Sequence, residues 1–582
     1  MNAVAADPYV RVASLAELRA AGRLVVHPEG AATVCLIADG DAVHAVDNRC
    51  PHMGFPLHRG TVADGILTCH WHHARFDLCS GGTFDQWADD LRRFPVELRG
   101  DDVLVDPRPP AGALEHQRQR LQVGLERDIP LVLAKATIAG MAAAADAAAS
   151  FRAGLEFGVA RRGDGWGRGL TTLTCLADLA PRLDADERAA ALYHGLSDVA
   201  AESAGEPPRF PLDPLPASGA GPDRLARWFR RFVEVRDGEG AERALVSAVR
   251  AGATPEQLAD MLFAACTDHR YLDLGHVLDF TNKALEALDL AGWEHAEAVL
   301  ASLPWQLANA QRMEERNAWR NPVDLVALLD EAFASLPDAL AEPAAGGWQG
   351  RRALVETVLG DDPAASFAAL LHALRAGATA VELASAVSFA AATRIARFPI
   401  SNEFGDWDTA LHTFTFANAV EQGLRRSPSP QLLRGVFDAA ASVYLDRFLN
   451  VPATRLPTPQ PGADPGRLLD ELPALLDRQQ QVDAAAQLVA DYLAAGGEPD
   501  RMVAALGAAL VREERNFHTI QCVEAASRQQ QLLAGGEDEA LPLLAAARYL
   551  AAHATTTRAQ RQTFEIARRL HRGERLYEEA DL

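Results

Sequence analysis

The chain has 582 residues, and its 79 acidic side chains outnumber its 56 lysines and arginines, which gives a formal net charge of −23 at pH 7. A surface this negative disfavours nucleic acids and anionic membranes as partners. Seven cysteines without a dense framework are typical of a reducing compartment. The sequence has neither a signal-peptide pattern nor an apolar run of 18 residues, so we expect a cytoplasmic protein without a membrane segment.

The first hundred residues predict short antiparallel strands. Residues 33–48 alternate apolar and polar side chains around Asp39-Gly40-Asp41, which predicts a strand, a turn and a second strand. Residues 94–105 show the same pattern around a turn that begins at Gly100, and they predict a closing hairpin.

Between these strands lie two Cys–His pairs, CPH from Cys50 and CHWH from Cys69. Two thiols and two imidazoles at the spacings Cys-x-His and Cys-x2-His are the ligand set of a Rieske [2Fe–2S] cluster. The stretch CPHMGFPLHRGTVADGILTCHWHHARFDLCSGGTF resembles the Rieske ferredoxin family, and the resemblance covers residues 8–107. It implies a small antiparallel β module with two loops at its tip, with Cys50 and Cys69 on one iron and His52 and His72 on the other.

Structural zinc is the alternative for two cysteines and two histidines. Zinc motifs usually pair their ligands as Cys-x2-Cys and His-x3-His, whereas cysteines and histidines interleave here and Pro51 separates the first two ligands. This order favours the cluster. Because the Cys-x2-His spacing selects His72, we expect the adjacent His73 to be a neighbour of the cluster that is not a ligand.

Four neighbouring residues separate this module from the respiratory-complex type of Rieske protein. That type has an extra cysteine beside each ligand pair, joined as a disulfide, and Phe55 and Trp71 stand at those positions here. It also has serine and tyrosine hydroxyls that donate to the cluster sulfurs, and Ala74 and Phe76 replace them. Since such hydrogen bonds stabilise the reduced state, we expect a low potential, as in the oxygenase-associated ferredoxins.

A Pro- and Gly-rich segment at 106–112 ends the strands, and the remaining sequence is rich in Ala, Leu and Arg with helical periodicity. The predicted fold is multidomain α+β, a small antiparallel β Rieske module followed by a large all-α helical repeat bundle. The predicted boundaries are 8–107 for the Rieske domain, 108–114 for a linker, 115–340 for one helical half and 341–582 for the other. Lysine occurs only at 135 and 283, which we attribute to a GC-rich genome and not to function.

The helical part contains an internal repeat. RAGATPEQLADMLFAA begins at Arg250, RAGATAVELASAVSFAA at Arg375 and AAGGEPDRMVAALGAAL at Ala494, and each predicts a turn, an N-cap and an amphipathic helix. A degenerate copy around Leu170 would be the fourth unit. We therefore expect four helical units arranged as two halves. The pattern faintly resembles carboxymuconolactone-decarboxylase repeats, but the redox Cys-x-x-Cys is absent, so no residues are transferred from that family.

A second helix follows each repeat, and His276, His412 and His518 occupy one matched position in it. Helical bundles build oxygen-activating iron sites from inward-facing histidines and carboxylates, so we predict a second, non-haem iron at these three residues. The alternative is that each histidine makes a hydrogen bond within its own unit. The nearby acidic candidates are Asp273, Glu403, Asp408, Glu514 and Glu524. An insertion at 397–407 lengthens only one copy and is either a lid over a pocket or a surface loop.

Two functions fit these patterns. The first is an oxidoreductase of the oxygenase type, in which the Rieske module passes electrons from a reductase to a metal or small-molecule substrate in the helical domain. The second is a non-catalytic fusion that senses redox state and binds a partner protein through its repeats. A tethered electron donor has a high effective concentration, which favours the enzyme. The Asp-x2-His-x4-His motif of the oxygenase α-subunit is absent.

Overall fold

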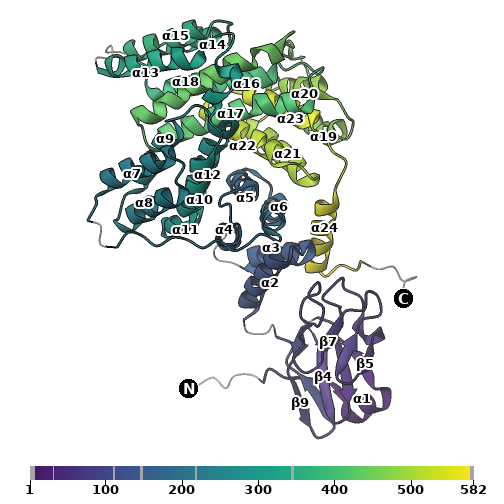
Figure 1. The fold of residues 1–582 in the computed structure, drawn as a ribbon. Coiled ribbons are helices and arrows are strands. Elements are labelled where there is room, and N and C mark those ends of the chain that lie inside the picture. Colours follow the sequence, from purple (N-terminus) through teal and green to yellow (C-terminus); the bar gives the residue numbers. More distant parts are fainter. Residues whose placement is uncertain are drawn as a thin grey trace, which may run out of the picture. The chain divides into compact units, whose positions relative to one another are not determined.

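The computed structural model describes residues 7–29, 32–108, 112–143, 148–216, 219–341, 347–460 and 462–576. The chain divides into two compact units, Met1–Ser150 with Gln560–Leu582 and Phe151–Ala559. The first contains all the described strands and the second is helical, so the predicted α+β class is confirmed (Figure 1). The boundaries expected at 108–114 and at 340 stay a prediction.

Three small antiparallel sheets form the N-terminal module. Their strands are β1 (Val10–Ser14), β10 (Asp102–Val105) and β9 (Val96–Arg99) in one sheet, β2 (Arg23–Val26), β3 (Val34–Asp39), β4 (Ala42–Asp47) and β8 (Arg93–Phe94) in the second, and β5 (Thr61–Ala63), β6 (Ile66–Thr68) and β7 (Arg75–Asp77) in the third. Both predicted hairpins are present. β3 pairs with β4 across a two-residue turn in which Gly40 has a positive φ of 59°, and β9 pairs with β10.

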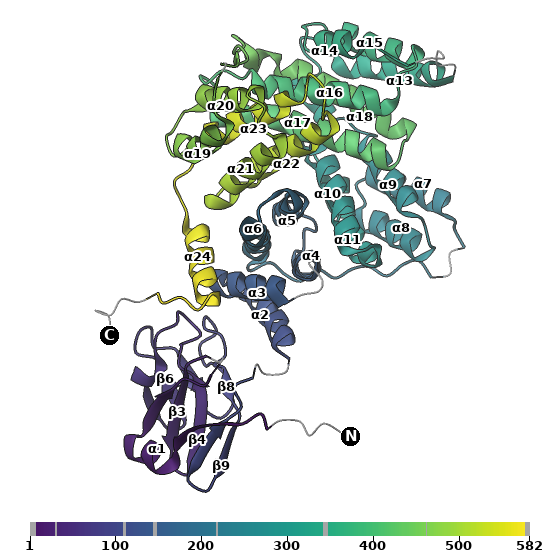
Figure 2. The ribbon, with the colours of Figure 1, turned by 180° about the vertical axis from the view of Figure 1, so that it is seen from behind.

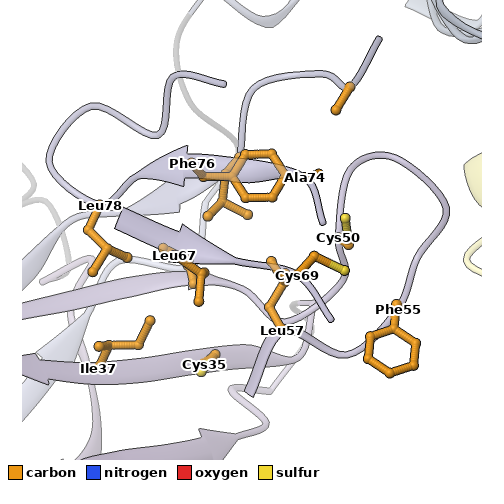
Figure 3. Packing of buried hydrophobic residues seen from close by; sticks show 13 residues of the cluster. Cys35, Ile37, Cys50, Phe55, Leu57, Leu67, Cys69, Ala74, Phe76 and Leu78 are labelled. Atoms are coloured by element: carbon orange, nitrogen blue, oxygen red, sulfur yellow. The ribbon is translucent and has the colours of Figure 1, made fainter. Parts of the chain in front are cut away.

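The β module has two hydrophobic cores. One lies between the first two sheets and includes Leu18 of α1 (Leu15–Ala21). The other includes Leu67, Phe76 and Leu78 together with Cys50 and Cys69 of the two Cys–His loops (Figure 3). The second core therefore fixes the strands from which both loops project.

Three helices complete the first unit, namely α2 (Ala113–Arg127), α3 (Pro130–Ala143) and most of α24 (Ala559–His571). Helices α2 and α3 pack closely because Gly124 leaves room for Leu133, and a Cβ at Gly124 would come within 2.8 Å of the Leu133 side chain. Residues from the end of the chain thus belong to the same compact unit as its beginning.

The second unit is built of helices joined by short turns. They are α4 (Ala149–Arg161), α5 (Arg168–Leu179), α6 (Ala185–Ser203), α7 (Pro222–Glu234), α8 (Gly238–Arg250), α9 (Pro255–Cys266), α10 (His276–Ala291), α11 (Ala296–Ala301), α12 (Pro304–Asn309), α13 (Leu325–Ala341), α14 (Arg351–Val358), α15 (Pro363–Arg375), α16 (Ala380–Ala396), α17 (Phe404–Arg426), α18 (Pro430–Leu445), α19 (Pro465–Leu476), α20 (Val482–Ala494), α21 (Pro499–Arg512), α22 (Phe517–Leu532) and α23 (Ala540–Ala552). None of the helices in the described part of the chain is long and apolar enough to cross a bilayer.

The predicted N-caps are visible in two of the repeated segments. Thr254 and Gln257 form a capping box at the start of α9, and Thr379 and Glu382 form the same arrangement at the start of α16. Whether the segments form a true structural repeat stays a prediction.

Four helices surround the centre of the second unit. Helix α5 packs against α10 and α22, and α17 packs against the same two helices, which closes a ring (Figure 2). The directions of α10 and α22 follow from two contacts: His276 stacks on His518, and two turns further along Lys283 pairs with Glu524. These helices are therefore parallel, and the matched histidines lie at one level.

Candidate metal centres

The two Cys–His loops of the β module are closed in the same way. The Cys50 amide donates to the Phe55 carbonyl at 2.8 Å, and the Cys69 amide donates to the Ala74 carbonyl at 2.8 Å. Each cysteine therefore bonds to the residue five positions later. Within the loops Gly54 and His73 have positive φ values of 81° and 62°, which allow the tight turns.

The loops bring two thiols and two imidazoles together. Cys50 and Cys69 are buried side by side (Figure 3). The hydrogen bond between them lowers the pKa of Cys69 and raises that of Cys50. The rings of His52 and His72 lie edge to face with centroids 4.9 Å apart. Burial, followed by the Lys135 charge, lowers the pKa of His52 to about 4, and burial also lowers the pKa of His72, so both rings are neutral at pH 7.

One atom of this set has no protein partner. His52 Nδ1 is buried and makes no hydrogen bond with any described residue. A buried imidazole nitrogen without a partner is costly in an apolar setting, and bonding to a metal relieves that cost. Two thiols and two neutral imidazoles, one of them with this unpartnered nitrogen, fit a [2Fe–2S] cluster.

Aromatic rings cover the ligands. Trp87 lies 4.6 Å from the His52 ring, Trp71 lies 4.5 Å from the His72 ring, and Phe55 packs against Trp71 at 5.7 Å, all between centroids. All seven cysteines, each within the described residues, are free. An apolar cover therefore stands where the respiratory-complex type has its disulfide.

The three histidines of the helical unit also meet. His276 begins α10, His518 is the second residue of α22, and His412 lies in the first half of α17. One nitrogen from each ring lies within 4.8 Å of the other two, and the Nε2 atoms of His412 and His518 are 3.0 Å apart. Helices that are far apart in the sequence thus present three half-buried imidazoles to one point.

These imidazoles are held in the neutral form. Burial, followed by the charge of Arg168, lowers the pKa of His276 to about 4. Burial and the neighbouring rings lower the pKa values of His412 and His518 to about 3. A neutral imidazole offers a lone pair, which is the form that binds a metal ion.

Of the five acidic candidates, Asp408 lies beside the imidazoles. Its carboxylate is 3.6 Å from Nδ1 of His518 and 3.7 Å from Nε2 of His553, and it accepts a hydrogen bond from the Tyr549 hydroxyl. Three of the others have roles elsewhere: Asp273 accepts from the Gln311 amide, Glu403 caps α17, and Glu524 pairs with Lys283. The backbone amide of Glu514 donates to the Thr557 carbonyl.

The comparisons with known proteins concern the N-terminal module. Residues 9–95 match the family model of the Rieske [2Fe-2S] domain. The ferredoxin component of biphenyl 2,3-dioxygenase from Rhodococcus jostii is 33% identical over 88 residues, which are 15% of this chain and 82% of that protein. The chain belongs to the Rieske [2Fe–2S] family.

Other relatives are similar to the same Rieske module. Apoptosis-inducing factor 3 from Homo sapiens is 36% identical over 87 residues, 15% of this chain, and the chain spans only 14% of the length of that protein. A solved complex of reduced oxygenase and oxidized ferredoxin in carbazole 1,9a-dioxygenase has 23% identity and a TM-score of 0.17, and it covers 18% of this chain and 95% of that chain.

Sequence reasoning missed a lysine at the first Rieske loop. Lys135 of α3 donates through Nζ to the carbonyl of His52 at 2.6 Å and to the carbonyl of Pro51, and it lies 3.7 Å from Asp89. Asp89 in turn accepts from Arg120 of α2 at 2.6 Å. A helix of the first unit therefore places a positive charge against a ligand loop.

The second lysine lies at the centre of the helical unit. Lys283 Nζ is 2.7 Å from Glu286 and 2.7 Å from Glu524, and Arg528 lies 2.9 Å from Asp178. Oxygens of these three carboxylates lie within 4.8 Å of one another, as in a metal site, but Lys283 and Arg528 balance two of the three charges, and burial raises the pKa of Asp178 to about 8. Both lysines thus make specific buried contacts, and our attribution of their rarity to genome composition missed this. The rarity of lysine in the sequence was the signal that could have pointed to these two residues.

Proposed function

We propose that this protein is an oxidoreductase of the oxygenase type, with a [2Fe–2S] cluster in the Rieske module and a non-haem iron in the helical unit. The proposed ligands are Cys50, His52, Cys69 and His72 for the cluster and His276, His412 and His518 for the iron. When bound, these groups supply one-electron transfer from a reductase and a site for oxygen activation.

The spacing of the three imidazole nitrogens carries the proposal. Nitrogens bound to one ion at about 2.0–2.2 Å lie roughly 2.8–3.6 Å apart when the ligand angles are near 90–109°. The His412 and His518 nitrogens, at 3.0 Å, already have this spacing, and His276 lies within 4.8 Å of both. The hydrogen bond joins rings from two different helices, which argues against the alternative that each histidine serves only its own unit.

Asp408 supports the proposal as a positioning residue. A histidine that binds a metal usually presents its other nitrogen to a carboxylate, which fixes the ring and strengthens the ligand. Asp408 lies on this side of His518, at Nδ1, while Nε2 faces His412. Its bond from Tyr549 holds the carboxylate in turn.

The Rieske module supports the redox half of the proposal. Its named relatives include ferredoxin components of dioxygenase systems, which favours a reductase as electron donor and a small molecule as substrate. His72 is exposed, so its imidazole is the part of the ligand set nearest to a docking reductase, whereas both cysteines are buried.

Metal analysis tests the proposal directly. Anaerobically purified protein should contain two cluster irons and one further iron per chain, and His412→Ala should lose the further iron with the Rieske electron paramagnetic resonance signal intact. His372→Ala, which removes an exposed histidine from α15, is the matched control and should keep all the iron. Wild-type protein with only the cluster irons would overturn the proposal and favour the redox-sensing fusion that binds a partner protein.

A further inference from the structure

A pocket of about 510 Å³ lies in the helical unit and is lined in part by His412. Its walls come from the loop that precedes α10, from residues 313–323, from the first half of α17, and from the end of α18 with the turn after it. Because His412 belongs both to this wall and to the imidazole cluster, a molecule in the pocket lies next to the proposed iron.

Most of the wall is apolar. Leu274, Met313, Trp319 and Leu445 line it, and the indole of Trp319 stands 6.0 Å from the Tyr271 ring between centroids. The volume is in the usual range for pockets that enclose a small organic molecule. Aromatic walls of this kind favour a molecule with rings.

One carboxylate oxygen in the wall lacks a hydrogen-bond partner among the described residues. Asp446 is 4% exposed, and its Oδ2 makes no hydrogen bond with any described residue. Burial raises the pKa of Asp446 to about 7 and outweighs the hydrogen bond with Thr413 and the charge of Arg394, both of which act to lower this pKa. A buried carboxylate oxygen without a donor is costly, and a hydroxyl on a bound molecule would remove that cost.

The wall carries charges of both signs. Arg316 and Arg447 are positive, Asp406 is negative, and Asp446, whose pKa burial raises to about 7, is partly ionised at neutral pH. The guanidinium of Arg447 is also stacked on the Phe448 ring at 3.8 Å. Because charges of both signs lie among mainly apolar side chains, the wall favours a neutral molecule over a carboxylate or an ammonium.

The loop before α10 joins the pocket to the imidazole cluster. Tyr271, Asp273 and Leu274 have positive φ values of 48°, 46° and 59°, and such strained backbone is typical of functional sites. At Gly275 a Cβ would come within 2.8 Å of the Tyr271 ring, so only glycine fits. The next residue is His276, and the pocket wall and the metal site are therefore built on one strained segment.

The insertion predicted at 397–407 contributes to the wall of this pocket. Residues 404–407 form the first turn of α17, which is longer than its counterparts, and Asp406 in this turn lines the pocket. The insertion is thus partly pocket wall and not solely a surface loop.

We infer that this pocket binds the substrate of the proposed oxidoreductase, a neutral, mainly apolar ring compound whose hydroxyl donates to Asp446. That the bound molecule is a substrate rests on the proposed function, whereas its binding to the pocket is measured without turnover.

The test uses the full-length protein and three matched probes, 4-phenylphenol, biphenyl and 4-phenylbenzoate, in equilibrium dialysis. We expect 4-phenylphenol to bind at least about tenfold more tightly than the other two, since a hydrogen bond to a buried carboxylate accounts for roughly that factor. Asp446→Leu should remove the preference for the phenol over biphenyl. Ala318→Trp, at an exposed wall position, should block all binding without disturbing the core.

Three results would overturn the inference: no binding of any probe, equal binding of 4-phenylphenol and biphenyl, or unchanged binding in Ala318→Trp. The iron content of the same samples separates this inference from the proposed function. Selective phenol binding in protein with only cluster iron would keep the pocket and reject the second iron. A full iron content without binding of any probe would keep the second iron and reject the pocket.

Discussion

The two units place their candidate ligands in opposite ways. In the Rieske unit the four ligands lie between residues 50 and 72, on two loops that local backbone hydrogen bonds close. In the helical unit His412 and His518 are 106 positions apart and meet only because α17 packs against α22. A local ligand set is encoded in spacing, whereas a distributed one depends on the packing of the whole bundle.

The two lysines extend this comparison. Lys135 lies on α3, a helix of the Rieske unit itself, and contacts the backbone of one ligand loop. Lys283 lies inside the helical ring and holds together carboxylates from two helices. The first is expected to tune a cofactor, and the second to stabilise a fold.

The largest expected effect separates the local ligands from their neighbours. His72→Ala should abolish the Rieske spectrum, because one iron loses a ligand that no other residue replaces, whereas His73→Ala should leave it intact. Electron paramagnetic resonance of the reduced proteins measures both. Loss of the signal in His73→Ala with retention in His72→Ala would reverse the assignment.

The second prediction concerns the fold of the helical unit. Lys283→Met should lower the free energy of unfolding by about 3–5 kcal/mol, since it leaves Glu286 and Glu524 buried with Arg528 as their remaining cation. Urea denaturation followed by circular dichroism measures the change. Arg352→Met, at an exposed pair with Glu356, is the control and should change it by less than about 0.5 kcal/mol. Equal effects of the two substitutions would mean that the network contributes little.

The third prediction concerns the potential of the cluster. With Ala74 and Phe76 fully buried and without hydroxyls, the potential should lie in the lower part of the range of roughly −150 to +300 mV for Rieske centres. Phe76→Tyr should raise it by adding a donor near the sulfurs. Protein-film voltammetry measures both, and a wild-type value near the upper end would contradict the argument.

The smallest expected effect tests the helix that touches the Rieske loop. Lys135→Met should lower the potential by on the order of tens of millivolts, the Coulomb effect of one charge across roughly 10 Å of partly screened protein. A positive charge stabilises the reduced cluster, so removing the charge lowers the reduction potential. Arg127→Met, an exposed charge on α2, is the control and should shift the potential less. An unchanged potential in Lys135→Met would make its contact structural only.

The sequence by itself determined the Rieske module and the local starts of helices. The Cys–His spacings, the Asp39-Gly40 turn and the Thr254 and Thr379 caps depend on residues within a few positions of one another, so a short stretch encodes them. The repeat register also suggested that His276, His412 and His518 are equivalent, but it left open whether they meet.

Only the tertiary structure decided which distant groups share a site. It placed Asp408 beside His518, Asp446 in the pocket wall, and Lys135 on the Rieske loop. The sequence offered Asp408 only as one of five acidic candidates and Lys135 only as a rare residue, since a buried carboxylate or lysine has the same local sequence pattern as an exposed one. The physical reason is that their partners lie across helix interfaces, and the energy of such contacts arises from packing that no single segment contains.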